Sequence, residues 1–257
     1  MIDIHSHILN NVDDGSNSLE NTIDILRKAE QANFTDIILT PHYIEGYYEN
    51  TKIKIKRNIN KLKKEVYKED IITQLYQGNE ILLTENTPQL LTNSKISTLA
   101  NSRYILFELP FSNRILNLPQ IIYEIKVNGY IPILAHPERY TYIQENPNNI
   151  IEIIKYGILI QSNYGSFTGQ YGKTVKQTAE ILLENNLIHF LGTDTHRQGY
   201  IYENIKIILK RLKELSGDEK YINEITTTNP QKILEDLDIY IDCPEKIKEK
   251  KKVFFFF

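Results

Sequence analysis

Residues 1–7, with the sequence MIDIHSH, begin as an alternating apolar segment and end on two histidines. The stretch 2–5 (IDIH) is typical of a β-strand, with His5 and His7 at its end. Side chains two apart in an extended segment point to the same side, so the two imidazoles are expected to lie together. An HxH pair alone is weak, because two histidines often take this spacing by chance. The rest of the chain decides what the pair means.

The same order, a short apolar run followed by an amphipathic stretch, recurs along the whole chain. We expect strands at residues 2–5, 36–40, 72–77, 104–109, 131–135, 158–161 and 188–192. We expect helices at residues 19–32, 55–66, 118–128, 148–156, 173–185, 202–215 and 229–237. Alternating strands and helices form right-handed βαβ units with parallel strands. Seven such units in 257 residues predict one α/β domain closed into a barrel, with an open doubly wound sheet as the alternative.

Composition narrows the class of protein. Hydrophobic residues make up 41% and charged residues 25%, an ordinary globular balance. The net charge of −3 shows no basic surplus, which disfavours nucleic acid as a partner because phosphate contacts need clustered Lys and Arg. The single cysteine, Cys243, cannot form an internal disulfide, and no secretory signal or membrane-spanning stretch is visible. We therefore expect a cytoplasmic protein that is not itself in the membrane.

Metal-binding side chains follow the predicted strands at most strand ends. In a parallel barrel these ends share one face, where the βα loops converge. Nine residues qualify: His5, His7, Asp14, His42, Glu80, Glu108, His136, Asp194 and His196. Imidazoles and carboxylates in this number can hold two or three divalent ions. Neighbouring ions can clamp the attacking and leaving oxygens of a phosphoryl group, so the pattern predicts a metal-dependent phosphohydrolase.

The individual positions differ in how strongly they indicate a metal ligand. Asp194 and His196 repeat the two-residue spacing at another strand end, which chance explains poorly. Glu108 lies in apolar LFELP, where an unpaired carboxylate is costly, so a metal or a buried arginine is expected beside it. Glu80 stands in GNE beyond an apolar run, with a helix cap or a surface group as the alternative. His189 lies inside a predicted strand and is interpreted as a hydrogen-bonded structural residue.

Several motifs together resemble the polymerase and histidinol phosphatase (PHP) family. They are, in order over about residues 1–240, MIDIHSHIL, DDGS, TPHY, GNE, LFELP, AHPERY and GTDTH. They are most similar to the bacterial manganese-dependent protein-tyrosine phosphatases found with capsule and exopolysaccharide biosynthesis. The resemblance implies a distorted (β/α)7 barrel of PHP type, TIM-barrel-like, as a single domain over residues 1–242. Residues 243–257 then form a charged and Phe-rich tail with no assigned function.

By position, the resemblance also implies three metal sites. The first has four ligands: His5, His7, Glu80 and Asp194. The second shares Glu80 as a bridge and adds two ligands: Glu108 and His136. The third has three ligands: Asp14, His42 and His196. Members of this family use Mn²⁺, although a mixed nitrogen and oxygen site also accepts Fe, Co or Zn.

Substrate contacts are implied at three positions. Arg139, in HPERY, matches the family's arginine near the substrate phosphate, with a surface salt bridge as the alternative. The family's second arginine, several residues beyond the last DxH, is missing, and Arg197 directly after His196 is expected to replace it. Tyr43 belongs to a set of aromatic residues expected to rim the site and pack against a phenyl ring. The others in that set are Tyr47, Tyr48, Phe111 and Tyr140.

The function implied is hydrolysis of phosphotyrosine in proteins, with Arg139, Glu80 and Asp194 as catalytic residues. The expected partner is a membrane-associated tyrosine kinase of capsular or exopolysaccharide synthesis, and the oligomeric state is left open. Cys243 has no CxxxxxR context, which argues against a cysteine nucleophile. The alternatives are a PHP phosphatase on a small metabolite such as histidinol phosphate, a nuclease, and a non-catalytic metal-binding scaffold.

Overall fold

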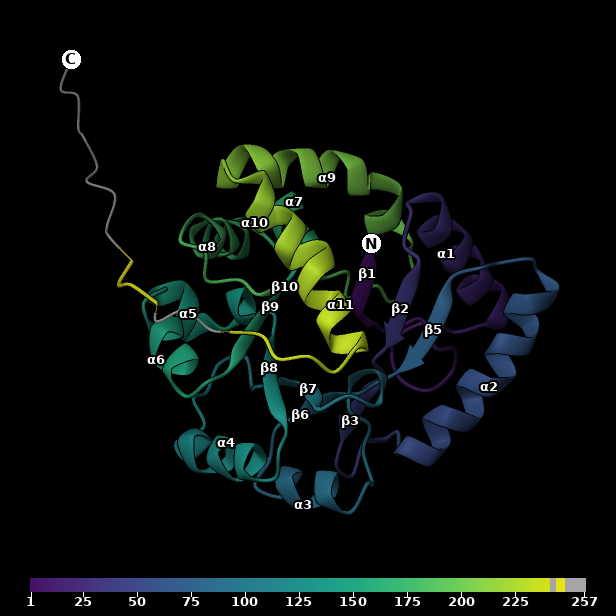
Figure 1. Cartoon of the computed structure of the whole chain (residues 1–257), viewed down its shortest axis with the longest axis horizontal. Coiled ribbons are helices and arrows are strands. Elements are labelled where there is room, and N and C mark those ends of the chain that lie inside the picture. Colours follow the sequence, from purple (N-terminus) through teal and green to yellow (C-terminus); the bar gives the residue numbers. More distant parts are fainter. Residues whose placement is uncertain (241–243, 248–257) are drawn as a thin grey trace.

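Parallel strands form a ring with helices around it in the computed structural model of the chain (Figure 1). The structure describes residues 1–240 and 244–247. Most of the predicted tail, including Cys243 and the four terminal phenylalanines, lies outside the described residues. Among the residues described, no helix has the length and apolarity needed to cross a membrane.

The strands pair into two sheets. The smaller sheet has the order β1 (Ile2–Ser6), β2 (Asp36–Leu39) and β5 (Gln74–Gln77). The larger one has the order β10 (Phe190–Gly192), β9 (Leu159–Asn163), β8 (Ile131–Ala135), β7 (Tyr104–Glu108), β6 (Glu80–Leu82), β3 (His42–Ile44) and β4 (Tyr48–Glu49). All pairs are parallel except the β3–β4 hairpin.

Two barrel strands are broken and change sheets halfway. The strand that begins as β2 continues as β3 after Pro41, and the strand that begins as β5 continues as β6 after Gly78. The first halves pair with each other, and the second halves pair with His42 opposite Glu80. Proline lacks the N–H that an unbroken ladder requires, which accounts for the first break. The barrel therefore has seven strand units, as predicted. The strand expected at 36–40 ends at Leu39, the one expected at 72–77 begins at Gln74, and the second halves β3 and β6, with the hairpin strand β4, were missed.

Each predicted helix is present, close to its predicted range, although the last one ends three residues early. These helices are α1 (Leu19–Gln31), α2 (Lys52–Lys68), α4 (Leu118–Val127), α6 (Asn149–Lys155), α8 (Lys173–Glu184), α9 (Tyr200–Ser216) and α11 (Asn229–Leu234). Shorter elements that periodicity did not predict are α3 (Thr87–Thr92), α5 (Thr141–Glu145), α7 (Tyr164–Thr168), α10 (Glu219–Asn223), η1 (Leu99–Asn101), η2 (Pro137–Arg139) and η3 (Glu224–Thr228). Segments of one turn or two are too short to display a helical period.

The barrel interior is apolar at one end and polar at the other. Ile4, Leu106 and Ile133 belong to an inner cluster of buried side chains contributed by the strands. Ile233 of α11 joins this cluster, and α11 lies across the ring in Figure 1. The apolar end is therefore closed by α11, and polar ligands can gather only at the opposite end, the C-terminal ends of the strands.

Asp3 closes the seam between the first and last strands. Its Oδ1 accepts hydrogen bonds from the backbone N–H groups of His5 (3.2 Å) and Thr193 (3.0 Å). Its Oδ2 accepts from the hydroxyls of Thr193 (2.6 Å) and Tyr202 (2.7 Å). Burial raises the pKa of Asp3, and the hydrogen bonds from Thr193 and Tyr202 oppose that shift. The backbone of Asp194 then donates to the carbonyl of His5 at 2.8 Å, so the seam lies directly beneath two predicted ligands.

Replacing Asp3 tests how much the seam contributes to stability. Asp3→Ala leaves two buried backbone N–H groups without an acceptor, so we expect the free energy of unfolding to fall by about 3 kcal/mol. Asp3→Asn should lose much less, because its amide oxygen still accepts from both N–H groups and the two hydroxyls can rotate to accept from its NH₂. Urea unfolding of both variants measures the difference. Equal stability of Asp3→Ala and the wild type would show that the Asp3 hydrogen bonds do not stabilise the fold.

Candidate metal centre

All nine predicted ligands converge at the polar end of the barrel. Their ligand atoms fall into four overlapping groups, within each of which the atoms lie no more than 4.8 Å apart. The groups are His5, His7 and Glu80; His5, His136 and Asp194; His42, Glu80 and Glu108; and His7, Asp14, His42 and His196. The division of these ligands among individual ions stays a prediction.

Glu80 lies at the centre of the cluster. Its Oε2 lies 3.2 Å from His5 Nε2, 3.1 Å from His7 Nε2 and 3.2 Å from His42 Nδ1. Its Oε1 lies 2.8 Å from His136 Nε2. Only 1% of the Glu80 surface is exposed. This carboxylate therefore touches imidazoles from three different strand units and is placed to be shared between neighbouring ions.

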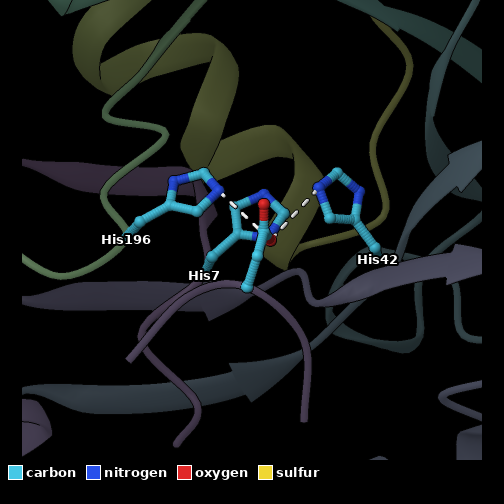
Figure 2. A group of neighbouring side chains, drawn as sticks. His7, His42 and His196 are labelled. Atoms are coloured by element: carbon cyan, nitrogen blue, oxygen red, sulfur yellow. Dashed lines mark ion pairs between the residues drawn. The ribbon is translucent and has the colours of Figure 1, made fainter. Parts of the chain in front are cut away.

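The outer group opens toward the solvent. Figure 2 shows His7, His42 and His196 converging from separate segments of the chain. Asp14 Oδ1 lies 3.5 Å from His196 Nε2 and 3.7 Å from His42 Nε2. About half of the Asp14 side chain (52%) is exposed, so this group is the most open to solvent of the four. Hydrogen bonding to His196, with the charges of His196 and His42, holds the pKa of Asp14 below its usual range.

Several atoms of the cluster are poorly satisfied by the protein alone. His5 Nε2 and His7 Nε2 face each other at 3.1 Å, although both side chains are fully buried. In the described part of the chain, His42 Nδ1, Glu80 Oε2 and His136 Nδ1 are buried without a hydrogen-bond partner. Buried polar groups normally have such partners. The cluster thus fits a set of divalent cations, whose bonds would satisfy the facing nitrogens and the central carboxylate.

The charges at the site are strongly coupled. Burial lowers the pKa of His5, but the charges of Glu80 and Asp194 outweigh it and raise the pKa to about 9. Burial and the charge of Glu80 raise the pKa of Glu108 to about 8. Glu108 was expected beside a metal or a buried arginine, and the structure pairs it with His42 Nδ1 at 3.5 Å. The raised pKa values of His5 and His7 couple metal binding to proton release, because an imidazole must lose its proton to bind a metal ion.

Backbone conformation at two ligands is unusual. His136 has φ 34° and Asp194 has φ 51°, both in the left-handed region, which is uncommon for residues other than glycine although His and Asp enter it more often than most. His136 directly follows β8, and Asp194 lies two residues after the end of β10. Such conformations persist where surrounding structure imposes them, and they concentrate at functional sites. Gly192 contributes to the same crowding, because a Cβ there would lie 2.7 Å from the Cβ of His5.

Asp13 is a functional residue that the sequence reasoning missed. Its Oδ2 accepts hydrogen bonds from His7 Nδ1 (2.9 Å) and from the backbone N–H of His42 (2.9 Å). A carboxylate on the outer nitrogen of a ligating imidazole orients the ring and leaves the inner nitrogen free for metal. Gly15 makes this loop possible, since a Cβ at that position would lie 1.8 Å from the carbonyl oxygen of His7. The signal was present in DDGS, where only the second aspartate was selected.

Strand β9, which carried no predicted site residue, supplies a second set of orienting groups. His5 Nδ1 lies 2.9 Å from Gln161 Oε1, Gln161 Nε2 donates to Asn163 Oδ1 at 2.9 Å, and Asn163 Nδ2 donates to Asp194 Oδ2 at 2.7 Å. All of these side chains are buried. If His5 Nδ1 donates, every later amide must also donate toward Asp194, so the chain of bonds has one consistent direction. We call His5–Gln161–Asn163–Asp194 the amide relay.

The predicted arginines lie at the edge of the site. Arg139 Nη1 donates to Asp194 Oδ2 at 3.1 Å, and its side chain is 27% exposed. Arg197 Nε donates to the backbone carbonyls of Asp14 (3.2 Å) and Gly15 (3.1 Å), so this arginine holds the loop that carries Asp13 and Asp14. Both arginines line a cleft of about 620 Å³ together with Asp14, Tyr171, Asp194 and His196.

Two of the aromatic residues predicted to rim the site are instead in the core. Tyr43 is 1% exposed and packs in the apolar cluster between strands and helices, so it does not face substrate. Tyr140 is fully buried, and its hydroxyl donates to the carbonyl of Ala135 and accepts from the N–H of Leu109. Phe111, which is 39% exposed, keeps a rim position. Which face a side chain takes in a short strand or loop depends on packing that residue type does not reveal.

His189 has the structural environment expected for it. Its Nδ1 accepts a hydrogen bond from the backbone N–H of Ile160 at 3.0 Å. Burial lowers its pKa to about 4, which keeps the ring neutral. It lies outside all four groups of ligand atoms.

Comparison with known proteins relates this fold and site to a known group. Residues 1–235 match the family described as "Capsular polysaccharide synthesis, CpsB/CapC". The chain is 33% identical to the tyrosine-protein phosphatase YwqE of Bacillus subtilis (strain 168), with 100% of each chain covered. It is 31% identical to the tyrosine-protein phosphatase CpsB of Streptococcus pneumoniae, covering 92% of this chain and 99% of that protein.

A solved structure agrees with these relationships. The chain superposes with a TM-score of 0.90 on a crystal structure from a study of YwqE and S. pneumoniae CpsB, which that study calls metal-dependent tyrosine phosphatases. The identity is 33%, over 97% of this chain and 100% of that one. With the distorted barrel and the convergent His, Asp and Glu cluster, these similarities show that the chain belongs to the CpsB/CapC family of capsular polysaccharide synthesis proteins.

Proposed function

We propose that this protein is a metal-dependent protein-tyrosine phosphatase. The observation that carries the proposal is the cluster around Glu80, in which nine ligand side chains meet beside a cleft that also holds Arg139. Full-length relatives at 31% and 33% identity bear the name tyrosine-protein phosphatase. We further propose a phosphotyrosine protein of capsule or exopolysaccharide synthesis as the substrate, in particular a membrane-associated tyrosine kinase, and a cytoplasmic location.

The metal ions proposed are Mn²⁺, at two or three positions among the nine ligands. We propose one catalytic domain over residues 1–242. When bound, divalent ions supply Lewis-acid polarisation of the phosphoryl group and an activated water nucleophile. The mixture of imidazole and carboxylate ligands supports a transition metal over Mg²⁺ or Ca²⁺, which prefer oxygen ligands.

The chain's own residues position these groups. Asp13 and Gln161 accept hydrogen bonds from the outer nitrogens of His7 and His5, which keeps the inner Nε2 atoms available as ligands. Arg139 offers N–H groups at the cleft, where they bind the equatorial phosphoryl oxygens and stabilise charge that develops during hydrolysis. Tyrosine leaves as a phenolate, which needs little protonation from the protein.

The shape of the entrance supports a protein substrate over a small metabolite. The outer ligand Asp14 is half exposed, and the exposed rings of Tyr47 and Phe111 lie on loops that follow ligand-bearing strands. An open entrance of this kind admits a tyrosine side chain carried on a flexible segment. An aromatic rim can add about 1 kcal/mol of stacking with the phenyl ring.

Phosphate release under defined metal conditions tests the proposed function. We expect the Mn²⁺-loaded protein to hydrolyse a phosphotyrosine peptide with a higher kcat/KM than a matched phosphoserine peptide or histidinol phosphate. Dialysis against a chelator should abolish turnover, and Mn²⁺ should restore it. A preference for histidinol phosphate would place the protein among metabolite phosphatases, and unchanged turnover after complete metal removal would overturn the metal-dependent mechanism.

The geometry of the guanidinium group makes a second prediction. Arg139→Lys keeps the positive charge but cannot form the planar pair of bonds to phosphate, so kcat/KM should fall about 100-fold. Arg57→Lys, the same change at an exposed position of α2, should leave kcat/KM unaffected and serves as the control. Full activity in Arg139→Lys would show that a point charge is sufficient at this position.

The amide relay makes a third prediction. Gln161→Met keeps the length of the side chain but removes the acceptor for His5 Nδ1, so affinity for Mn²⁺ should fall about 10- to 100-fold. Titration of the metal-free protein with Mn²⁺ measures this affinity directly. Gln120→Met, at an exposed position of α4, is the matched control. Unchanged Mn²⁺ affinity in Gln161→Met would mean that the relay does not orient His5 for binding.

A further inference from the structure

Tyr171 lies in the cleft, and none of the sequence motifs marked it. It follows α7 in the short segment before α8. We propose that Tyr171 is a positioning residue that, with Phe111, holds the guanidinium plane of Arg139 edge-on to the substrate phosphate. This inference rests on the proposed phosphatase function and adds a residue to the same site.

The guanidinium of Arg139 lies between two aromatic rings. Its central carbon is 4.7 Å from the centroid of the Phe111 ring and 4.7 Å from the centroid of the Tyr171 ring. Cations favour the faces of aromatic rings, and a planar guanidinium can stack against them. We call Phe111, Arg139 and Tyr171 the aromatic slot.

The slot decides which part of Arg139 remains available. One N–H group, on Nη1, donates to Asp194 Oδ2 at 3.1 Å. Because a ring lies 4.7 Å from the central carbon at both Phe111 and Tyr171, a ligand in this proposal approaches the other N–H groups along the guanidinium plane. Planar N–H groups presented at an edge match the spacing of two phosphate oxygens. The slot therefore presets the bidentate orientation and reduces the conformational freedom that a long arginine side chain loses on binding.

Each ring is itself fixed to the metal cluster. The hydroxyl of Tyr171 lies 3.4 Å from Asp194 Oδ2 and 3.5 Å from Asn163 Nδ2, the last amide of the relay. The Phe111 ring stacks on His136, with centroids 5.8 Å apart and an interplanar angle of 23°. The backbone carbonyl of Phe111 also accepts from the N–H of Thr141 at 2.9 Å. Both rings that contact Arg139 therefore also contact predicted metal ligands: Tyr171 contacts Asp194, and Phe111 contacts His136.

Three variants separate the ring of Tyr171 from its hydroxyl and from its bulk. Tyr171→Leu retains an apolar side chain without a π face, and Tyr171→Phe retains the ring without the hydroxyl. Tyr123→Leu, at an exposed position of α4, is the control. In Mn²⁺-loaded protein we measure binding of inorganic phosphate by calorimetry, kcat and KM for p-nitrophenyl phosphate, metal content and thermal unfolding.

We expect Tyr171→Leu to weaken phosphate binding and raise KM about tenfold, with metal content unchanged. Tyr171→Phe should lose less, about two- to threefold, because its ring remains although the contact of its hydroxyl with Asp194 Oδ2 is gone. The same Tyr171→Leu change in an Arg139→Lys background should have little further effect, since the two residues act through one contact. Tyr171→Phe as impaired as Tyr171→Leu, or losses that simply multiply in the double variant, would overturn the proposal.

The outcomes for the slot and for the phosphatase function are distinct. If the wild type binds phosphate in a Tyr171-dependent way but hydrolyses no aryl phosphate, the slot stands and the proposed function fails. If the wild type is an active phosphatase and Tyr171→Leu leaves both phosphate binding and KM unchanged, the function stands and the slot fails. A loss of metal or of thermal stability in Tyr171→Leu alone would assign Tyr171 a structural role and overturn the proposal as well.

Discussion

The carboxylate of Glu80 is the group on which the rest of the site depends. Its oxygens lie within 3.2 Å of nitrogen atoms from His5, His7, His42 and His136, in a place that solvent scarcely reaches. A buried carboxylate among imidazoles needs a balance of positive charge, supplied either by protons or by cations. The facing Nε2 atoms of His5 and His7, 3.1 Å apart, fit cations, because each imidazole nitrogen can bind a metal ion when it carries no proton.

The distortion of the barrel follows from the same requirement. An unbroken third strand would carry its residues along one sheet, whereas the break after Gln77 lets Glu80 begin a new strand that pairs with His42 across the ladder. The left-handed backbone at His136 and Asp194 turns two further ligands into the same volume. Closure by Asp3 and the absence of a side chain at Gly192 bring β1 and β10 together, which sets His5 against Asp194. Local strain and close packing at the strand ends thus create a site that the regular fold alone would not provide.

A second layer of residues determines how the ligands are presented. Asp13 and the amide relay fix the outer nitrogens of His7 and His5, and the relay ends on Asp194, which also receives Arg139. The predicted metal ligands and Arg139, for which we propose a role in phosphate binding, therefore share one hydrogen-bond network. A displacement of any member of this network would change the positions of side chains at both the ligand cluster and the cleft.

The sequence by itself determined the seven strand units, most helix ranges and the nine His, Asp and Glu side chains that converge at the polar end. These are properties of short segments, and a parallel barrel brings its strand ends together whatever the details of packing. Only the tertiary structure decided that two strands change sheets, that Tyr43 and Tyr140 turn into the core, and that Gln161, Asn163 and Tyr171 lie against the predicted site. An amide or a tyrosine gains such a role from partners distant in the chain, and the residue type alone does not reveal those partners. The His and Asp residues at the strand ends are different from these amides and from Tyr171. So many of them at strand ends have few functions other than metal binding, so their residue types alone predicted the site.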